Sequence, residues 1–600
     1  MLRQRVTNVY FLCRPVPWVY LPLLAYQDVF VMTVLAWVAH GFFWFARSPR
    51  ASRSVTRAGY CVVLLLAVWG AVDNIIFSYL HTDATYKLFI LSDDLHLISG
   101  SIPYAMGAAT PYVWVLIGIL TTIAVTEGLS RYAPDFLRHA RARFYSPLCL
   151  ALILIYVVGA HAWAARHLRY PSAALNAEWA FISPWFEKKP LPSSALADYY
   201  DDFEPEGRRP AYASVWPALL PTTPRYNVVM VVMESVGAHN LGLYGAPYDD
   251  TPQLKRLESH AAVFNHIYAA QGNTSAAMTA LFCSLYPRLD WFPVPRWHPD
   301  LASRGLPALL EQHGYATALI DSGSISEDRR SEFLLDHGFT SVVAEHRDPR
   351  LPQDPPLLSA AVDWIDAHRT KPFFLTLWTM DTHHPYIAAG DRSFAVRDPM
   401  LNRYLNGVQS IDALIGRLAD RLQQMGLADN TLLVITGDHG EAFGEHGETV
   451  HGFTVYNEEL QVPLMIVNPR LFRERLPVDQ PGRQIDIAPT LLSLLGLPSP
   501  AQWQGVSLFR WRPHRRAYLF ADDTNFILGV IDAHMMKYIY DFNLGRAQLY
   551  DLAADPDERH DLAGDSTYAA TMARDKLRLQ AWASFQDPYL RSLAATADNQ

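Results

Sequence analysis

Cysteine and charged residues are both scarce in this sequence. Only 4 of its 600 residues are cysteine, and charged residues make up 18%. Cys13, Cys61 and Cys149 lie in apolar segments, which leaves Cys283 alone in the remainder. One cysteine cannot form an intramolecular disulfide, so a disulfide framework in the second half is excluded. The scarcity of cysteine does not identify the cellular compartment, because an oxidising compartment permits disulfides without requiring them.

An excess of positive charge is also absent. The formal net charge is −9, which gives no reason to propose nucleic acid as a partner. Hydrophobic residues, by contrast, make up 50% of the chain, and they concentrate before residue 170. Because 600 residues exceed one ordinary core, at least two domains are expected.

The first part of the chain is dominated by long apolar segments. Four of them approach the length of about 20 residues that spans a bilayer: 28–46, 58–80, 109–129 and 145–165. Segment 10–26 is a fifth candidate, although Arg14 and two prolines also suit a position in the membrane interface. The sequence therefore predicts a transmembrane domain over residues 1–170. The alternative is a set of buried helices in a soluble protein.

Arginines indicate which side of the membrane each loop occupies. They cluster in the loops 47–57 and 131–143, and the positive-inside rule places both loops in the cytoplasm. Arg3 and Arg5 favour an internal start and hence five spans. The chain after the last span is then outside. Residues 171–225 mix aromatics, prolines and charges, which predicts a juxtamembrane connector with interfacial helices or, alternatively, an ordinary linker.

Strand-like and helix-like segments alternate from residue 226 onward, which predicts an α/β fold with a largely parallel sheet. Three apolar runs predict buried strands: 228–233, 373–380 and 431–435. They lead to Glu234, to His383 and to the pair Asp438 and His439. Because ligands bind at the carboxyl ends of such strands, these side chains are expected to form one site. Carboxylates and imidazole suit a divalent metal such as zinc or manganese.

A candidate nucleophile lies in the segment 271–278, where Gly272 allows the backbone to approach a ligand closely. Thr274 is expected in the first turn of a helix that runs to Leu285, where backbone N–H groups hold an oxyanion well. Metal coordination can activate a threonine hydroxyl by lowering its pKa. Two alternatives stay open: a plain N-cap threonine, and Ser275 as the nucleophile.

The order of short motifs after residue 226 resembles the alkaline-phosphatase/sulfatase superfamily over nearly the whole second half. Six segments carry the resemblance: ESVG at 234–237, LYG at 243–245, GDHGE at 437–441, FGEHG at 443–447, YNEELQVP at 456–463 and DIAPTL at 486–491. The segment LYDL at 549–552, followed by Asp555, Pro556 and Glu558, is also sulfatase-like. The resemblance implies an α-helical membrane domain followed by an α/β sulfatase-like catalytic domain at 226–600.

Departures from the sulfatase pattern indicate which branch of the superfamily this chain resembles. Sulfatases place a cysteine or serine, converted to formylglycine, in a C/S-x-P-x-R motif at a fixed distance before Tyr-Pro. Counting back from Tyr286 puts Thr274 at that position, with Ala276 and Met278 in place of the proline and arginine. Threonine cannot become formylglycine, so sulfate-ester hydrolysis by that route is not available.

Threonine at this position is typical of two membrane-anchored relatives. These are the lipoteichoic acid synthase type phosphoglycerol transferases and the lipid A phosphoethanolamine transferases, both with five spans and an external catalytic domain. Glu234 and His451 also fit them. The phosphoethanolamine branch usually has several disulfides in its catalytic domain, which the single Cys283 does not permit.

By this resemblance Glu234, Thr274, Asp438 and His439 bind one divalent ion, manganese or zinc, and Thr274 is the nucleophile. His383 and His451 would bind the substrate phosphate or a second ion. The implied reaction takes a headgroup from a membrane phospholipid through a phospho-threonine intermediate to an envelope glycan or lipid. The implied location is the bacterial inner membrane, with the catalytic domain on the periplasmic side. The oligomeric state is left open.

Two other functions remain open. One is hydrolysis of a phosphoric or sulfuric ester, in which water takes the place of the acceptor. The other is a lipid-sensing or scaffolding protein on the same fold without catalysis. Members of that kind lose the nucleophile or metal ligands, whereas this chain has a residue of the expected type at every matched position.

Overall fold

A computed structural model describes most of the chain from residue 225 onward. The described residues are 225–289, 301, 303–323, 329–344, 351–510, 515–522 and 526–597, together with 155, 156, 199, 203 and 205. Nearly all of the predicted spans and of the predicted connector lie outside them. Among the described helices, none is both long and apolar enough to cross a bilayer. The membrane domain therefore stays a prediction.

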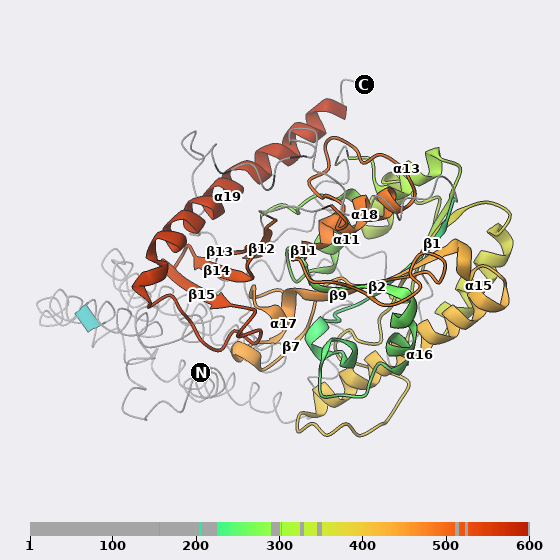
Figure 1. The fold of residues 1–600 in the computed structure, drawn as a ribbon, viewed down its shortest axis with the longest axis horizontal. Coiled ribbons are helices and arrows are strands. Elements are labelled where there is room, and N and C mark those ends of the chain that lie inside the picture. The colour runs from blue at the N-terminus through green and yellow to red at the C-terminus, as the bar shows by residue number, and fades with distance from the viewer. Residues whose placement is uncertain are drawn as a thin grey trace, which may run out of the picture. The chain divides into compact units, whose positions relative to one another are not determined.

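The larger sheet of the described chain has nine strands and is mostly parallel (Figure 1), as predicted. Its strand order is β10-β2-β9-β6-β1-β5-β3-β4, and β11 also pairs with β2. Its strands are β1 (Asn227–Met233), β2 (Ala261–Tyr268), β3 (Ala316–Asp321), β4 (Ser341–Ala344), β5 (Phe373–Trp378), β6 (Thr431–Gly437), β9 (Gln461–Val467), β10 (Leu476–Val478) and β11 (Gly482–Arg483). Strand β9 is antiparallel to both of its neighbours, which the sequence did not indicate.

The three strands that carry the predicted ligands are neighbours at the centre of this sheet. In the register, Val232 of β1 lies opposite Trp378 of β5 on one side and Thr436 of β6 on the other. All seven residues of β1 are buried, as expected for a strand covered on both faces. Because the three strands are parallel and in step, their carboxyl ends open at one edge of the sheet.

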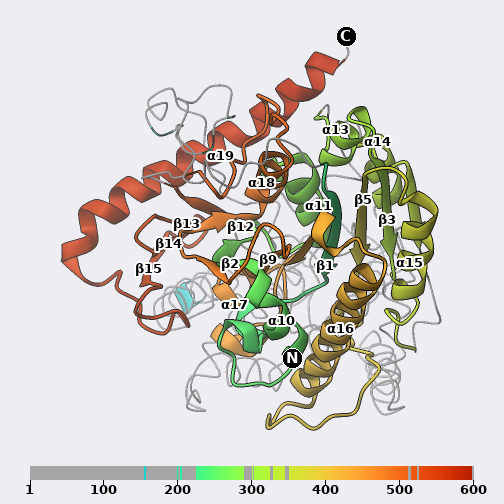
Figure 2. The same cartoon turned by 45° about the vertical axis from the view of Figure 1, so that its right-hand side comes forward.

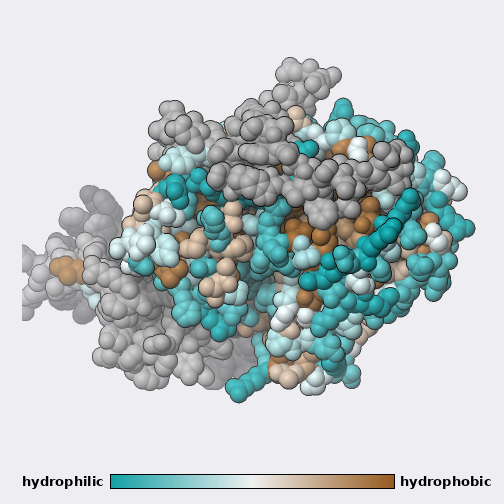
Figure 3. Space-filling view, in the orientation of Figure 1, coloured by the Kyte–Doolittle hydropathy of each residue, from teal (hydrophilic) through white to brown (hydrophobic). Residues whose placement is uncertain are grey.

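Helices cover both faces of the large sheet (Figures 1 and 2). The helices are α10 (Pro252–Leu257), α11 (Thr274–Cys283), α13 (Leu306–Gln312), α14 (Arg330–Asp336), α15 (Leu357–His368), α16 (Pro399–Gln424), α17 (Asn457–Leu460) and α18 (Ile487–Leu494). Buried apolar residues of α10, α15 and α16 pack with those of β1, β5 and β6 in one core. The outer surface near α15 and α16 is mostly hydrophilic (Figure 3). Burying one apolar face and exposing a polar one is the usual reason such a helix docks on a sheet.

A second sheet of four antiparallel strands follows in the chain. It has the order β12 (Ala517–Asp522), β13 (Phe526–Ile531), β14 (Met536–Asp541) and β15 (Arg546–Asp551), and α19 (Ala569–Ala597) lies along it (Figure 1). A two-stranded sheet is formed by β7 (Ala442–Phe443) and β8 (Thr449–Val450). Cys283 is buried and in no disulfide within the described residues.

Helix α10 starts at the pair Thr251 and Pro252, a sequence typical of an N-cap followed by a first helical residue. Thr251 stands at the N-cap position, but its side chain makes no capping hydrogen bond. Asp412 of α16 caps this helix instead. Its two carboxylate oxygens accept from Gln253 N at 2.9 Å and Leu254 N at 2.8 Å. A carboxylate from a distant helix thus satisfies two N–H groups that would otherwise lack a partner.

Replacing Asp412 with alanine is expected to lower the free energy of unfolding by about 1–2 kcal/mol, because two backbone donors at the partly buried start of α10 lose their acceptor. The urea midpoint of the full chain measures the change. Asp363, an exposed residue on α15, serves as the control when replaced with alanine. Equal midpoints for the two variants would contradict the capping role.

Candidate metal centre and nucleophile

Glu234 directly follows β1 and is almost fully buried. Trp378, the last residue of β5, donates its indole N–H to Glu234 Oε2 at 2.9 Å. The other oxygen, Oε1, accepts from Thr274 Oγ1 at 3.1 Å and lies 3.8 Å from His439 Nε2. Oε2 is therefore held by the indole, whereas Oε1, which also accepts from Ser235 Oγ at 3.3 Å, faces the candidate nucleophile and the imidazole.

Asp438 and His439 follow β6 and are fully buried. Asp438 Oδ1 accepts from Ser235 N and from His439 N, both at 2.8 Å. Asp438 Oδ2 accepts no hydrogen bond within the described chain and lies 3.4 Å from His439 Nε2. His439 Nδ1 lies 2.9 Å from Gly440 O, and a carbonyl can only accept. The proton is therefore on Nδ1, which leaves the Nε2 lone pair directed at the carboxylates.

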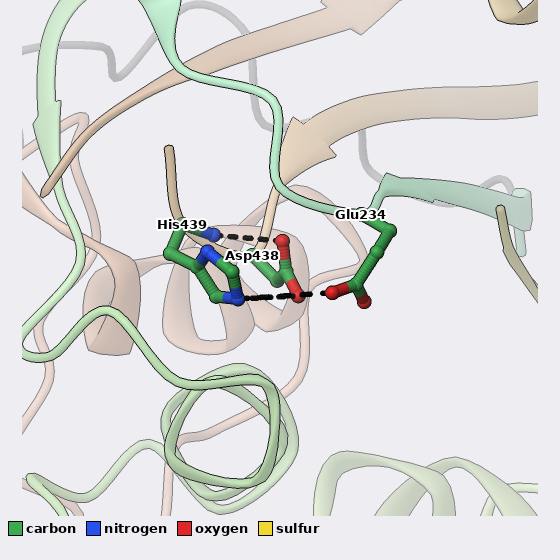
Figure 4. Close-up of side chains that lie close together, drawn as sticks. All are labelled: Glu234, Asp438 and His439. Atoms are coloured by element: carbon green, nitrogen blue, oxygen red, sulfur yellow. Dashed lines mark hydrogen bonds and ion pairs between the residues drawn. The ribbon is translucent and has the colours of Figure 1, made fainter. Parts of the chain in front are cut away.

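Together these side chains form a site with the donor set of a divalent cation. One ligand atom each from Glu234, Asp438 and His439 lies within 4.8 Å of the others, and Figure 4 shows the three side chains converging. No other group of this kind occurs in the described part of the chain. Two carboxylate oxygens, an imidazole nitrogen and a nearby hydroxyl match the ligands that zinc and manganese accept.

The electrostatics of the site also fit a cation. Burial opposes ionisation of Glu234, but the imidazoles of His439 and His383 and the Trp378 N–H hold its pKa at about 2. Burial and the adjacent Glu234 raise the pKa of Asp438 well above its ordinary value. Burial lowers the pKa of His439 to about 3, so this imidazole is a neutral ligand at pH 7. A bound dication would let both carboxylates ionise side by side.

Thr274 is the first residue of α11, but it is not the cap. Asn273 occupies the N-cap position, and its side chain accepts from Ala276 N at 3.1 Å. The Thr274 hydroxyl is not used for capping, and it contacts Glu234 Oε1 at 3.1 Å and His439 Nε2 at 3.4 Å. The plain N-cap alternative is wrong. The helix ends at Cys283, two residues before the predicted end at Leu285.

Ser275, the alternative nucleophile, has a different environment. Its hydroxyl is fully buried and accepts from Arg330 Nε at 3.3 Å. The Thr274 hydroxyl, by contrast, contacts Glu234 Oε1 and His439 Nε2. The geometry therefore favours Thr274 over Ser275.

His451 and His383, the predicted phosphate-binding pair, lie outside this ligand group. The ring centroid of His451 is 4.0 Å from that of His439, and His451 Nδ1 lies 3.0 Å from Glu441 Oε1. His383 Nδ1 lies 2.8 Å from the carbonyl oxygen of His384. Burial lowers the pKa of His451 to about 4. Each histidine thus has Nδ1 engaged by a neighbouring oxygen, and the phosphate-binding role stays a prediction.

Sequence reasoning missed two residues of the site. Glu441 is two residues beyond His439 in the GDHGE segment, and Trp378 ends the strand run that was predicted to continue to Met380. A buried acid inside a ligand motif was a usable signal for Glu441. The contact of Trp378 with Glu234 joins residues 144 positions apart, and no local pattern indicated it.

Replacing Trp378 with phenylalanine is expected to weaken divalent-metal binding about 10- to 100-fold, because Glu234 loses the donor that orients its carboxylate. Calorimetric titration with Mn²⁺ and Zn²⁺ measures the change. Trp503→Phe is the matched control, since Trp503 is also buried and donates its indole N–H to the carbonyl oxygen of Arg304. Equal affinities in the two variants would show that the Trp378 contact does not support the metal.

Comparison with known proteins also supports a sulfatase-like domain. The sulfatase family model matches residues 226–497, and the model for the C-terminal part of N-sulphoglucosamine sulphohydrolase matches residues 444–584. The human N-acetylgalactosamine-6-sulfatase is 25% identical over 334 residues, which cover 46% of this chain and 63% of that protein. The multifunctional alkaline phosphatase superfamily protein PehA of Trinickia caryophylli is 25% identical over 345 residues, with 44% and 66% covered. The chain thus spans less than two thirds of the length of these curated relatives.

Among solved structures, an alkaline phosphatase superfamily protein from Vibrio parahaemolyticus is similar in fold. It has a TM-score of 0.54 and 21% sequence identity, and the match covers 66% of this chain and 96% of that one. The two family models together match residues 226–584, which include the strand-end ligands. Residues 226–584 are thus similar in sequence to sulfatases, and the fold is shared with a protein of the alkaline phosphatase superfamily.

Proposed function

We propose that this chain is a metal-dependent phosphotransferase that moves a phospholipid headgroup, phosphoglycerol or phosphoethanolamine, to an envelope glycan or lipid. The observation that carries the proposal is the Thr274 hydroxyl, which contacts both Glu234 and His439 inside the cation-binding group. Threonine cannot be converted to formylglycine, so the hydroxyl itself is the available nucleophile. Phosphoryl transfer suits such a nucleophile when it is activated beside a metal.

The proposed reaction has two displacements at phosphorus. A divalent cation held by Glu234, Asp438 and His439 would lower the pKa of the Thr274 hydroxyl and neutralise charge on the phosphate. Thr274 Oγ1 forms a bond to phosphorus while the bond to the diacylglycerol oxygen breaks, and that oxygen leaves as diacylglycerol after gaining a proton. The acceptor hydroxyl then attacks the phospho-threonine, which transfers the headgroup and restores Thr274.

His451 is the side chain best placed to exchange the protons of these steps. Its ring lies beside that of His439, and Glu441 engages its Nδ1. The Nε2 atom is then the position at which a proton is accepted from, or given to, a reacting oxygen. In this proposal His383 contacts the phosphate oxygens from the segment that follows β5.

The membrane location is part of the proposal. Five apolar segments before residue 170 and arginine-rich loops support a multi-pass protein of the bacterial inner membrane with the catalytic domain outside. That arrangement would give the site access to membrane phospholipid as donor and to an envelope glycan or lipid as acceptor. No nucleic acid is involved.

Hydrolysis is the second candidate function. The names of the curated relatives favour it, because several are sulfatases. The same nucleophile would serve, with water resolving the phospho-threonine. A lipid sensor without catalysis is disfavoured, since the nucleophile and the candidate ligands lie together in one buried site.

The fate of a labelled headgroup separates these functions. The full-length protein in vesicles of phosphatidylglycerol and phosphatidylethanolamine, labelled in the headgroup, is incubated with Mn²⁺ and a glycolipid acceptor. We expect diacylglycerol release matched by label on the acceptor. Label released only as free headgroup would support hydrolysis, and intact donor lipid under every metal condition would contradict both.

A further inference from the structure

Glu459 lies beside the catalytic segments but has no role in the proposed reaction. It belongs to α17 and is fully buried. Its Oε2 accepts from the backbone N–H groups of Gly452 at 2.7 Å, Phe453 at 3.1 Å and Thr454 at 3.4 Å, and its Oε1 accepts from Thr454 Oγ1 at 2.5 Å. All of these donors come from the three residues directly after His451. One carboxylate therefore holds the loop that carries this histidine.

The backbone of Glu459 reaches a second catalytic segment. Its carbonyl oxygen accepts from Gly440 N at 2.7 Å, and the carbonyl of Gly440 in turn engages His439 Nδ1 at 2.9 Å. The orientation of the predicted metal ligand is thus tied to the same residue as the His451 loop.

The nucleophile loop packs against the same point. A Cβ atom at Gly272 would lie 2.9 Å from Gly452 N and 3.3 Å from Glu459 Oε2, a space too small for a side chain. Gly272 is two residues before Thr274. The segments that carry the nucleophile, the ligand His439 and His451 therefore all meet Glu459 or the loop it holds.

Helix α17 is itself held in place from the second sheet. Glu558 Oε2 accepts from Asn457 N at 2.6 Å, and Lys537 of β14 contacts Glu558 Oε1 at 2.8 Å and Asn457 Oδ1 at 3.1 Å. Lys537 and Glu558 are fully buried. Burial makes this pairing costly to break, so it is a firm support for a residue that positions others.

From these contacts we infer that Glu459 is a positioning residue, which holds the His451 loop and the His439 segment against the nucleophile loop by hydrogen bonding rather than by its charge. Its catalytic consequence rests on the proposed function, whereas its effect on the loop does not. A glutamine can reproduce the contacts: its amide oxygen accepts from the backbone N–H groups, and its amide nitrogen donates to Thr454 Oγ1. A methionine of similar length offers only one weakly accepting sulfur and no donor.

The test compares Glu459→Gln and Glu459→Met in the full chain, with Asp412→Ala as a control that also removes a buried carboxylate from backbone donors. In Glu459→Met we expect amide exchange at Gly452 and Thr454 to speed up about tenfold or more. We expect kcat to fall about 100-fold with little change in KM, because His451 is displaced. In Glu459→Gln both quantities should stay within about threefold of wild type. Asp412→Ala should leave kcat within about threefold of wild type and should speed exchange at Gly452 and Thr454 no more than its loss of global stability does.

Each outcome of this test either supports or overturns the inference. Unchanged exchange at Gly452 and Thr454 in Glu459→Met would overturn the inference. Equal losses in Glu459→Gln and Glu459→Met would show that the charge is needed, which also overturns it. If wild type transfers no headgroup, the proposed function fails, and the exchange measurements still test the loop. If Glu459→Met does not fold, Thr454→Val removes one donor at constant shape, and wild-type exchange and kcat in that variant would count against the inference.

Discussion

Replacing Thr274 with alanine is expected to abolish headgroup transfer, with a loss in kcat of about 10⁴-fold or more. Its hydroxyl is the nucleophile candidate that contacts Glu234 Oε1 and His439 Nε2. Bulk water cannot take the place of a metal-activated hydroxyl in forming the covalent phospho-threonine intermediate. The release of diacylglycerol from phospholipid vesicles measures the change.

Two variants make the result specific. Thr279→Val alters another buried threonine of α11, whose hydroxyl bonds to the carbonyl of Ser275, and should leave the rate near that of wild type. Thr274→Ser keeps a hydroxyl and should keep measurable activity. If Thr274→Ala retained the wild-type rate, the nucleophile would have to be a different residue.

Replacing Asp438 with asparagine is expected to weaken Mn²⁺ or Zn²⁺ binding about 100- to 1,000-fold and to remove activity with it. Oδ1 accepts from two backbone N–H groups, those of Ser235 and His439, so the amide oxygen must take that position. The amide NH₂ then takes the position of Oδ2. The cation therefore meets N–H hydrogens where the carboxylate offered a lone pair. Calorimetric titration of the metal-stripped protein gives the affinity.

Removal and return of metal complete this test. A chelator should inactivate the wild-type protein, and Mn²⁺ or Zn²⁺ should restore it. The same treatment should restore Asp438→Asn only at far higher metal concentration. Full activity in chelator, or wild-type affinity in Asp438→Asn, would show that the buried carboxylates do not hold a catalytic ion.

Sequence reasoning located the ligands because they follow buried strands. The runs before Glu234 and Asp438 are apolar throughout, and parallel strands of this kind bring their carboxyl ends together. The register of β1 with β6 then places both residues at one edge. Thr274 was already a candidate from its place at the start of a helix, but its distance to Tyr286, which depends on family resemblance, was what favoured it over the alternatives.

The supporting residues were not predictable in the same way. Trp378 acts through a contact between residues 144 positions apart, which only the tertiary fold sets. Glu441 and Glu459 contact residues 10 and 7 positions away, and of these two only Glu441 had a signal in the sequence. The capping of α10 by Asp412 is a further case, because the local pattern Thr-Pro already suggested a sufficient cap. Local signals report elements and their ends, whereas hydrogen bonds between distant elements depend on how those elements pack.

The covalent intermediate on Thr274 is the central claim, and intact-mass analysis tests it most directly. The full-length protein is incubated with phospholipid vesicles and Mn²⁺ or Zn²⁺, quenched in acid and weighed, and the modified peptide is then sequenced. We predict an added mass equal to the phosphorylated headgroup, located on Thr274 and absent from Thr274→Ala. An unmodified mass under every metal condition, or an adduct on another residue, would contradict the account.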